Sequence, residues 1–344
     1  MPLKSLKKAL VTGGCGFIGS RLVNQLVRDG FEVVVVDDMS VGDISALTEH
    51  KLLIRTVPAA LLNQFLVQDA MKQAGTLVIA ADFVDPIVLH HLQTGEFTHV
   101  FHLAANPRVS LSVEKPATTT ETNLMKTVEL LSACRDIGLE KFIFASSSAV
   151  YGDNHQLYGE PTTENDTPAP ESPYGLQKLA CEMFMKQFSQ LYGLNTIALR
   201  FFNVYGPGAA DGSAYMTAIT AWCAALSKGE PLRSDGDGDQ TRDMIYVDDV
   251  VDAMLDMAVW YSEPGFVVAN VATGNSTSNN MILEWLKIRF PSLTIQHAPE
   301  RAGDVKHTLA SILRIRELVG WQANTPIDKG LEKTLSWWNL KIGK

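Results

Sequence analysis

The stretch YGLQK at residues 174–178 places a phenol and an ammonium four positions apart, directly after Pro173. On a helix, two such side chains lie on the same face, one above the other. The pattern is also typical of an ordinary solvated helix start in which Tyr174 covers apolar surface. The alternative is chemical, because an ammonium beside a phenol favours the phenolate, a proton acceptor. An unperturbed tyrosine has a pKa near ~10, so an isolated phenol would not serve as a base at neutral pH.

A second candidate is TGGCGFIG, which spaces Gly13, Gly16 and Gly19 as GxxGxxG. It follows a strand-like apolar run and precedes a stretch with the apolar spacing of a helix. Glycines in such a turn let the backbone approach a pyrophosphate, which the free N–H groups of the helix N-terminus then face. Asp37 ends the next apolar run, where a carboxylate accepts from both ribose hydroxyls of NAD and repels a 2′-phosphate. This pattern predicts NAD, with an ordinary turn at the strand end as the alternative.

The elements that must position these groups follow a regular alternation. Apolar, β-branched runs typical of buried strands alternate with helical patterns along the first ~200 residues. This alternation predicts an α/β fold with a parallel, doubly wound, Rossmann-like sheet and right-handed crossovers. The strand-like runs are residues 9–12, 31–38, 77–82, 99–105, 141–148 and 195–203, and the clearest helical patterns are 17–30, 122–138 and the stretch after Pro173.

The composition of the sequence changes after Asn203, where glycine-rich polar stretches begin. We expect residues 1–203, with a return segment at about 243–274, to form an NAD-binding domain. Residues 204–242 and 275–344 are expected to form a smaller, mixed α/β lobe that binds substrate. Residues 45–78 are rich in apolar side chains but show no clear period, so no element is predicted there apart from the start of the strand-like run 77–82.

The composition excludes several classes of protein. A formal net charge of -9 over 344 residues argues against nucleic acid or an anionic membrane as the main partner. No apolar run approaches the ~20 residues that span a bilayer, and the N-terminal run ends in glycines, unlike a signal peptide. The four cysteines have no metal-ligand spacing. We therefore expect free thiols, no metal site and a soluble cytoplasmic protein.

Several motifs, in this order, resemble those of the extended short-chain dehydrogenase/reductase superfamily: TGGCGFIG, HLAA, ASSSAVYG, YGLQK, RFFNVYGPG and TRDMIYVDD. Within it the chain is most similar to nucleotide-sugar 4-epimerases, over nearly its whole length. The departure lies at residues 45–78, where those relatives have a shorter connection. The resemblance implies an enzyme with bound NAD. In such enzymes the hydride leaves C4, the 4-keto sugar turns over, and the hydride returns to the other face.

The resemblance implies that Tyr174 is the acid–base group and that Lys178 binds the nicotinamide ribose. It implies that Ser147 shares a hydrogen bond with the sugar 4-hydroxyl, although Ser146 and Ser148 are close enough for the assignment to slip by one. A polar strand end is the plain alternative for these serines. The cofactor contacts that it implies are Gly13, Gly16, Phe17, Ile18, Gly19, Asp37, Asp82, Phe83, Ala104, Ala105, Asn123, Ser146, Tyr174, Lys178 and Phe201.

The substrate contacts that the resemblance implies are Ser147, Ser148, Tyr174, Asn203, Arg242, Arg301, Asp304 and Thr308. The guanidinium groups of the two arginines would bind the diphosphate through bidentate, charge-assisted hydrogen bonds. Alternatively, they form surface ion pairs with Asp243 and Asp304. Thr308 falls where epimerases restricted to UDP-galactose have a bulky tyrosine and those acting on N-acetylated sugars have a small residue. A threonine leaves room for an acetamido group without excluding the smaller sugar.

The favoured function is interconversion of UDP-N-acetylglucosamine and UDP-N-acetylgalactosamine, with possible action on UDP-glucose and UDP-galactose. The first alternative is an epimerase for UDP-glucose and UDP-galactose only. The second is a nucleotide-sugar dehydratase or reductase, although related dehydratases carry an Asp–Glu pair where this chain has Ser148 and Ala149. The third is a non-catalytic NAD-binding sensor. The resemblance also implies a homodimer formed through helices near residues 120–136 and 174–192.

Overall fold

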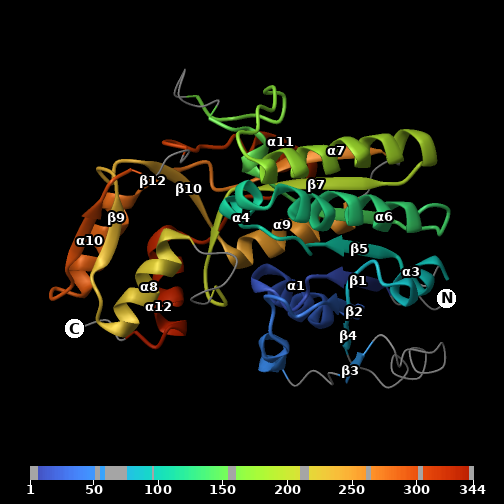
Figure 1. The fold of residues 1–344 in the computed structure, drawn as a ribbon, viewed down its shortest axis with the longest axis horizontal. Coiled ribbons are helices and arrows are strands. Elements are labelled where there is room, and N and C mark those ends of the chain that lie inside the picture. Colours follow the sequence, from blue (N-terminus) through green and yellow to red (C-terminus); the bar gives the residue numbers. More distant parts are fainter. Residues whose placement is uncertain are drawn as a thin grey trace.

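The centre of the molecule is an eight-stranded sheet whose paired strands all run parallel, in the order β11-β7-β6-β5-β1-β2-β4-β3 (Figure 1). The computed structural model describes residues 7–50, 55–58, 76–94, 97–153, 160–209, 217–260, 265–300 and 305–340. The strands of this sheet are β1 (Lys8–Thr12), β2 (Glu32–Asp37), β3 (Arg55–Pro58), β4 (Leu77–Ala80), β5 (His99–His102), β6 (Lys141–Ser147), β7 (Thr196–Phe201) and β11 (Phe266–Val271).

Helices cover both faces of this sheet, because successive strand residues point to opposite sides. In β1, Ala9 and Val11 pack into the core that contains α1 (Phe17–Arg28) and α9 (Val247–Val259). Leu10 instead joins the core beneath α3 (Pro86–Gln93), α6 (Lys126–Ala133) and α7 (Pro173–Tyr192). The predicted doubly wound α/β fold is therefore confirmed.

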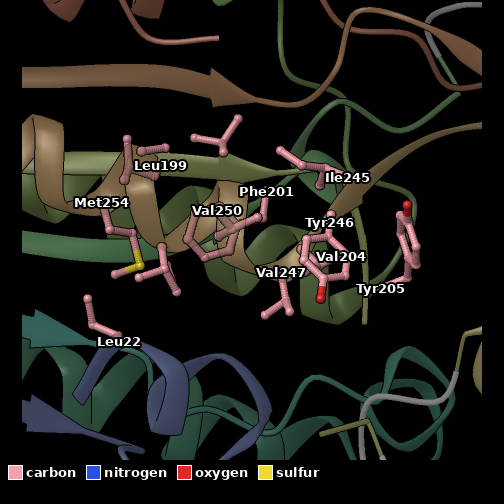
Figure 2. Close-up of a cluster of buried hydrophobic side chains, with 14 of the residues drawn as sticks. Leu22, Leu199, Phe201, Val204, Tyr205, Ile245, Tyr246, Val247, Val250 and Met254 are labelled. Atoms are coloured by element: carbon pink, nitrogen blue, oxygen red, sulfur yellow. The ribbon is translucent and has the colours of Figure 1, made fainter. Parts of the chain in front are cut away.

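Figure 2 shows the core beneath α9. Val250 and Met254 project from α9 towards Leu199 and Phe201 of β7, and Leu22 of α1 faces them. All of these side chains are buried. The apolar stripe of α9 thus seals one face of the sheet with residues that come more than forty positions after β7.

The run 195–203 is predicted as one strand, and this prediction is wrong at Phe202. The structure ends β7 at Phe201 and starts β8 (Asn203–Tyr205) in a different sheet, with the order β12-β10-β8. The side chain of Phe202 packs in a separate apolar cluster with Val150 and Tyr151. Its N–H donates a hydrogen bond to the carbonyl of Val271 at 3.1 Å. This break carries the chain from the main sheet into the second layer.

The second layer is smaller and mixed, as predicted. Its strands are β8, β10 (Thr241–Tyr246) and β12 (Ser276–Ser278), with β9 (Leu232–Asp235) and β13 (Ile295–Ala298) forming a separate parallel pair. Its helices are α8 (Ala218–Lys228), α10 (Asn279–Arg289) and α12 (Ile327–Trp337), whereas α11 (Leu313–Val319) packs against β11 of the main sheet. In Figure 1 the pair β9–β13 and helices α8, α10 and α12 lie beyond one end of the main sheet.

The helical pattern over 122–138 is interrupted in the structure. After α4 (Val109–Glu114) and α5 (Pro116–Thr120), the chain makes one π-helical turn, η3 (Glu121–Met125), before α6 begins at Lys126. Such π-helical turns are rare in proteins, but those that occur are often found at functional sites. Short 3₁₀ turns also occur at η1 (Ile44–His50) and η4 (Ser148–Val150).

The stretch 45–78 contributes most of η1 and the edge strand β3, neither of which was predicted, and the start of β4, which lies in the predicted run 77–82. Residues 51–54 and 59–75 lie outside the described residues. All four cysteines are free and buried, as expected from the sequence. In the described part of the chain, no helix combines the length and the apolar character needed to cross a bilayer.

Candidate active site

A pocket of about 650 Å³ opens at the carboxyl ends of the parallel strands. The strand order reverses between β1 and β5, and loops leaving such neighbouring strands diverge and form a crevice. Fifteen of the predicted residues line this pocket together: Gly13, Gly16, Phe17, Ile18, Gly19, Asp37, Asp82, Phe83, Ala104, Ala105, Ser146, Ser147, Tyr174, Lys178 and Phe201.

The turn between β1 and α1 has no space for a side chain at Gly13 or Gly19. A Cβ at Gly13 would lie 2.8 Å from the backbone nitrogen of Ala104, and one at Gly19 would lie 2.1 Å from the carbonyl oxygen of Gly13. Gly16 occupies the N-cap of α1 and offers no capping side chain. The N–H groups of Ile18 and Gly19 in the first turn of this twelve-residue helix therefore fit an anion such as a dinucleotide pyrophosphate.

Asp37, at the end of β2, is held in place by backbone donors. Its carboxylate oxygens accept from the N–H groups of Cys15 at 2.9 Å and Met39 at 3.0 Å. Burial raises the pKa of Asp37, while these two hydrogen bonds oppose that rise. Each oxygen keeps a further lone pair, so the group fits the hydroxyls of an adenosine ribose.

Helix α7 places Tyr174 and Lys178 on the pocket wall. The hydroxyl of Ser172 caps the helix by accepting from the N–H of Gly175 at 3.1 Å, and Pro173 occupies the first turn. The N–H of Tyr174 donates to the hydroxyl of Ser112 at 3.1 Å. These hydrogen bonds fix the backbone of the first turn of α7, from which the Tyr174 side chain extends to the pocket.

The Lys178 ammonium is almost completely buried, with the residue 3% exposed. Its Nζ donates to the carbonyl of Ala145 at 2.7 Å and lies 4.4 Å from the centroid of the Phe144 ring and 5.8 Å from that of Tyr174. Burial lowers the pKa of Lys178 to about 8, an effect that Cys181 and Glu182 oppose. The tyrosine and lysine therefore share one enclosed site, as the chemical interpretation of YGLQK requires.

The adjacent serines at the end of β6 have different partners. Ser146 donates to Glu182 Oε1 at 2.5 Å, and the carboxylate of Glu182 also receives two hydrogen bonds from Arg200, at 3.0 and 2.7 Å. Ser147 accepts from the N–H of Ala149 at 3.2 Å, which leaves its own proton for a further acceptor. Ser148 lies in η4 and is not part of the pocket lining.

The remaining predicted residues lie elsewhere. Asn123 is buried in η3, behind the lining. Asn203, Arg242 and Thr308 lie in the second layer, where Asn203 Nδ2 approaches Thr308 Oγ1 at 3.4 Å. Arg301 and Asp304 lie outside the described residues.

Asp243 is not a surface partner for Arg242, because its carboxylate is buried. It accepts from the N–H groups of Thr273, Gly274 and Ala310 and from the Thr273 hydroxyl. Arg242 instead donates to the carbonyls of Thr241 and Lys306, at 2.9 and 3.0 Å. The alternative in which Asp243 forms a surface ion pair is therefore wrong.

Sequence reasoning missed several residues of the lining. Lys126 forms an ion pair with Asp82 at the end of the pocket near β4, and Trp337 reaches the lining from α12. Lys126 lies one turn after Asn123, so a helical projection could have identified it. No local signal identifies Trp337, which comes from the far end of the chain. No metal-binding group of His, Cys, Asp or Glu side chains occurs within the described ranges.

Comparisons with known proteins agree with this geometry. The model of the NAD dependent epimerase/dehydratase family matches residues 9–272. The chain is 32% identical to the UDP-glucose 4-epimerase of Mycolicibacterium smegmatis over 338 residues, covering 97% of this chain and 99% of that protein.

Two solved structures have a closely similar fold. One is the UDP-N-acetylglucosamine 4-epimerase of Methanobrevibacter ruminantium M1 in complex with UDP-N-acetylmuramic acid, with a TM-score of 0.84, 32% identity and coverage of 97% of this chain and 99% of that one. The other is the UDP-glucose 4-epimerase of Thermus thermophilus in complex with NAD, with a TM-score of 0.80, 30% identity and coverage of 96% and 99%.

His102, at the end of β5, lies directly behind the pocket and is bonded through both ring nitrogens. Thr127 donates to the carbonyl of Asn123 at 2.8 Å, so its oxygen accepts from His102 Nε2 at 2.9 Å. The Nδ1 atom then accepts from Thr12 Oγ1 at 2.6 Å. This assignment makes His102 a neutral ring, and burial, with a smaller effect from the charge of Lys178, lowers its pKa to about 3.

Because the pKa of His102 in the folded state lies below its ordinary value of 6.5, folding favours the neutral ring. Its contribution to stability is complete above about pH 6.5 and is lost as the pH falls towards 3, by at most about 1.4 kcal/mol per pH unit. We expect His102→Asn to flatten the fall in the free energy of unfolding between about pH 6.5 and 4.5. Denaturant titrations at several pH values measure this slope, and His90→Asn, at an exposed position of α3, is the control. Equal slopes for His102→Asn and the wild type would contradict the prediction.

Proposed function

The chain belongs to the NAD dependent epimerase/dehydratase family, and we propose that it is a UDP-hexose 4-epimerase whose preferred pair is UDP-N-acetylglucosamine and UDP-N-acetylgalactosamine. The observation that carries the proposal is the convergence of Tyr174, Lys178 and Ser147 on the pocket that also contains the glycine turn and Asp37. We further propose that residues 1–203 and about 243–274 form the NAD domain, and that 204–242 and 275–344 bind the nucleotide sugar.

The distribution of carboxylates favours epimerisation over dehydration. The acidic residues of the described lining are Asp37, Asp38, Asp43 and Asp82, which follow β2 and β4 at the adenosine end. The lining around Ser147 and Tyr174 offers no carboxylate among the described residues. Elimination of water across C5 and C6 needs a second acid–base group there, whereas epimerisation at C4 does not.

Bound NAD would supply the reversible hydride chemistry at C4, and the protein has to move one proton. In the proposed mechanism the Tyr174 phenolate accepts the proton of the sugar 4-hydroxyl, while Ser147 donates a hydrogen bond to the same oxygen. The Lys178 ammonium stabilises the phenolate through its charge. Tyr174 then returns the proton when the sugar has presented its other face. Tyr174 and Lys178 are both buried, and the lower local dielectric strengthens the interaction between their charges.

The preference for an N-acetylated sugar rests on the small side chain at Thr308. Its hydroxyl accepts from the N–H of Asp243 at 3.2 Å and lies near Asn203, so the side chain is fixed against β8 and β10. The relatives described above include enzymes named for UDP-glucose and for UDP-N-acetylglucosamine. The support for the acetylated pair is therefore the small residue at position 308, where epimerases that act on N-acetylated sugars also have a small residue.

The proposed role of Tyr174 is tested by Tyr174→Phe, which removes the phenol oxygen and keeps the ring. We expect its turnover of UDP-N-acetylglucosamine, without added NAD, to fall by about 10²–10⁴-fold, because the proton acceptor is lost. Chromatography of both 4-epimers over time measures the rate. Tyr192→Phe, at the exposed end of α7, should leave the rate unchanged. Full activity of Tyr174→Phe would refute the assignment.

The proposed role of Thr308 is tested by Thr308→Tyr, which fills the space for the acetamido group. We expect kcat/KM for UDP-N-acetylglucosamine to fall by roughly 10²-fold while that for UDP-glucose changes less than about threefold. Thr308→Ser, which keeps the hydroxyl and the space, is the matched control. If both substrates lose activity equally, Thr308 is not the specificity determinant.

We also propose a homodimer formed through α7 and the helix that includes η3 and α6. Leu176, Met183 and Leu191 are between 58% and 67% exposed along α7, and Met125 of η3 is also exposed. Helices α6 and α7 run side by side in Figure 1 and both pack on the same face of the sheet. Large apolar side chains gathered on neighbouring exposed helices are typical of an interface between subunits.

A charge on this surface should separate the subunits. We expect the wild type to sediment as a dimer and Met183→Asp to sediment as a monomer, because an aspartate buried in an apolar interface would lose its hydration. Analytical ultracentrifugation across a range of concentrations measures both. Met281→Asp, at an exposed position of α10, is the control. A wild type that stays monomeric at every concentration would exclude the dimer.

A further inference from the structure

Gln177 lies on α7 between Tyr174 and Lys178, yet its side chain does not enter the pocket. The residue is 3% exposed. Its carboxamide oxygen accepts from Asn123 Nδ2 at 2.8 Å, and its Nε2 donates to the hydroxyls of Thr119 and Thr120, each at 3.0 Å. The carboxamide therefore uses both of its N–H donors and its oxygen inside the protein, in contacts with residues more than fifty positions away in the sequence.

Asn123 connects this carboxamide to the pocket. Its Oδ1 accepts from the N–H of Asn106 at 2.7 Å, and its Nδ2 donates to the carbonyl of Asn106 at 3.0 Å. Because backbone donors and acceptors are unambiguous, the orientation of the Asn123 amide is fixed, and that of Gln177 follows from it. Asn106 itself lines the pocket, in the loop that follows β5.

The π-helical turn holds Asn123 from the other side. Its carbonyl accepts from Thr127 Oγ1 at 2.8 Å and from Cys181 Sγ at 3.2 Å. Cys181 lies on α7, one turn after Gln177, so η3 and α7 are joined at two successive turns. Gln177 is therefore connected to Asn106 through a single intermediate residue, Asn123.

We propose that Gln177 is a positioning residue that couples the pocket loop at Asn106 to the helical turn carrying Tyr174 and Lys178. The pair Gln177–Asn123 is here called the amide clasp. The clasp holds the acid–base pair at a fixed distance from the loop that faces it across the pocket. The expected effect of the clasp on turnover rests on the proposed epimerase function. Misplacement of reacting groups by about 1 Å can cost about 10²-fold in rate, so loss of the clasp should lower turnover.

The test compares wild type with Gln177→Met, which keeps the length of the side chain and removes its hydrogen bonds. We expect kcat for UDP-sugar epimerisation to fall by about 10–100-fold, with KM within about twofold and with unchanged NAD content after purification. Gln93→Met, at an exposed position of α3, is the matched control and should match the wild type. Wild-type kcat in a folded Gln177→Met protein would overturn the proposal.

A second measurement does not depend on turnover. Hydrogen exchange of the backbone amide of Asn106 should accelerate at least about tenfold in Gln177→Met, because this amide is held by Asn123. Equal exchange in the variant and the wild type would overturn the coupling. If wild type epimerises no UDP-sugar, the proposed function fails, while the exchange result still decides whether the clasp exists.

Gln177→Met leaves buried donors without partners and can fail to fold. Thr120→Val is then the second variant, because Thr120 is only half-buried and its hydroxyl accepts one of the two bonds from Gln177 Nε2. Thr120→Val should change kcat and the exchange of the Asn106 amide in the same directions as Gln177→Met, with a smaller amplitude. Wild-type values of both in a folded Thr120→Val protein would then refute the proposal.

Discussion

The arrangement of the site depends on the burial of one ammonium group. Lys178 bonds the carbonyl of Ala145 and lies over the ring of Phe144, within almost fully buried surroundings. The carboxylate of Glu182, on the next turn of α7, attracts this ammonium electrostatically, but it is already bonded to Arg200 and Ser146. The lysine is therefore held in place mainly by a neutral acceptor and a ring, and its charge remains directed at the pocket. A buried cation of this kind is tolerated only where the surrounding groups are rigid.

That rigidity comes from a polar network behind the strand ends. Thr12, His102 and Thr127 form one hydrogen-bonded chain that ends at the carbonyl of Asn123. Asn123 and Gln177 extend it to the pocket loop and to α7. Each member uses its donors and acceptors within the network, so a change at one position leaves a buried polar group without its partner. The glycine turn, the loop after β5 and the acid–base helix are thus held by the same set of hydrogen bonds.

The sequence was sufficient for features that depend on local pattern. The alternation of strand and helix signals predicted the doubly wound sheet, because buried parallel strands and amphipathic helices have distinct periods. Fifteen of the predicted site residues line one pocket, since the ends of parallel strands meet at one edge of the sheet. Their individual roles stay predictions.

Features set by tertiary packing could not be predicted in the same way. Phe202 breaks a run that looks continuous, because its ring finds a separate cluster with Val150 and Tyr151. The π-helical turn at η3 has no periodic signature distinct from a helix. The amide clasp joins residues separated by 54 positions, and an asparagine and a glutamine carry no signal of each other in the sequence. In the sequence, Asp243 looked like a surface ion-pair partner for Arg242. In the structure its carboxylate is buried, and it accepts hydrogen bonds from the loop after β11 and from the N–H of Ala310.

The late position of α9 has a consequence for the synthesis of the chain. Ile143, Ile197 and Leu199 of β6 and β7 belong to the core that α9 completes, yet α9 begins only at Val247 and the edge strand β11 only at Phe266. A nascent chain that has emerged as far as Asn203 contains the strands through β7 and the start of β8, but it exposes this apolar face to water. The first two hundred residues therefore cannot reach their final packing ahead of the rest, although they contain the glycine turn and the acid–base pair. Because β7 pairs with β11 and packs against α9, which both come later in the chain, folding of the sheet should be completed only after these later segments have left the ribosome.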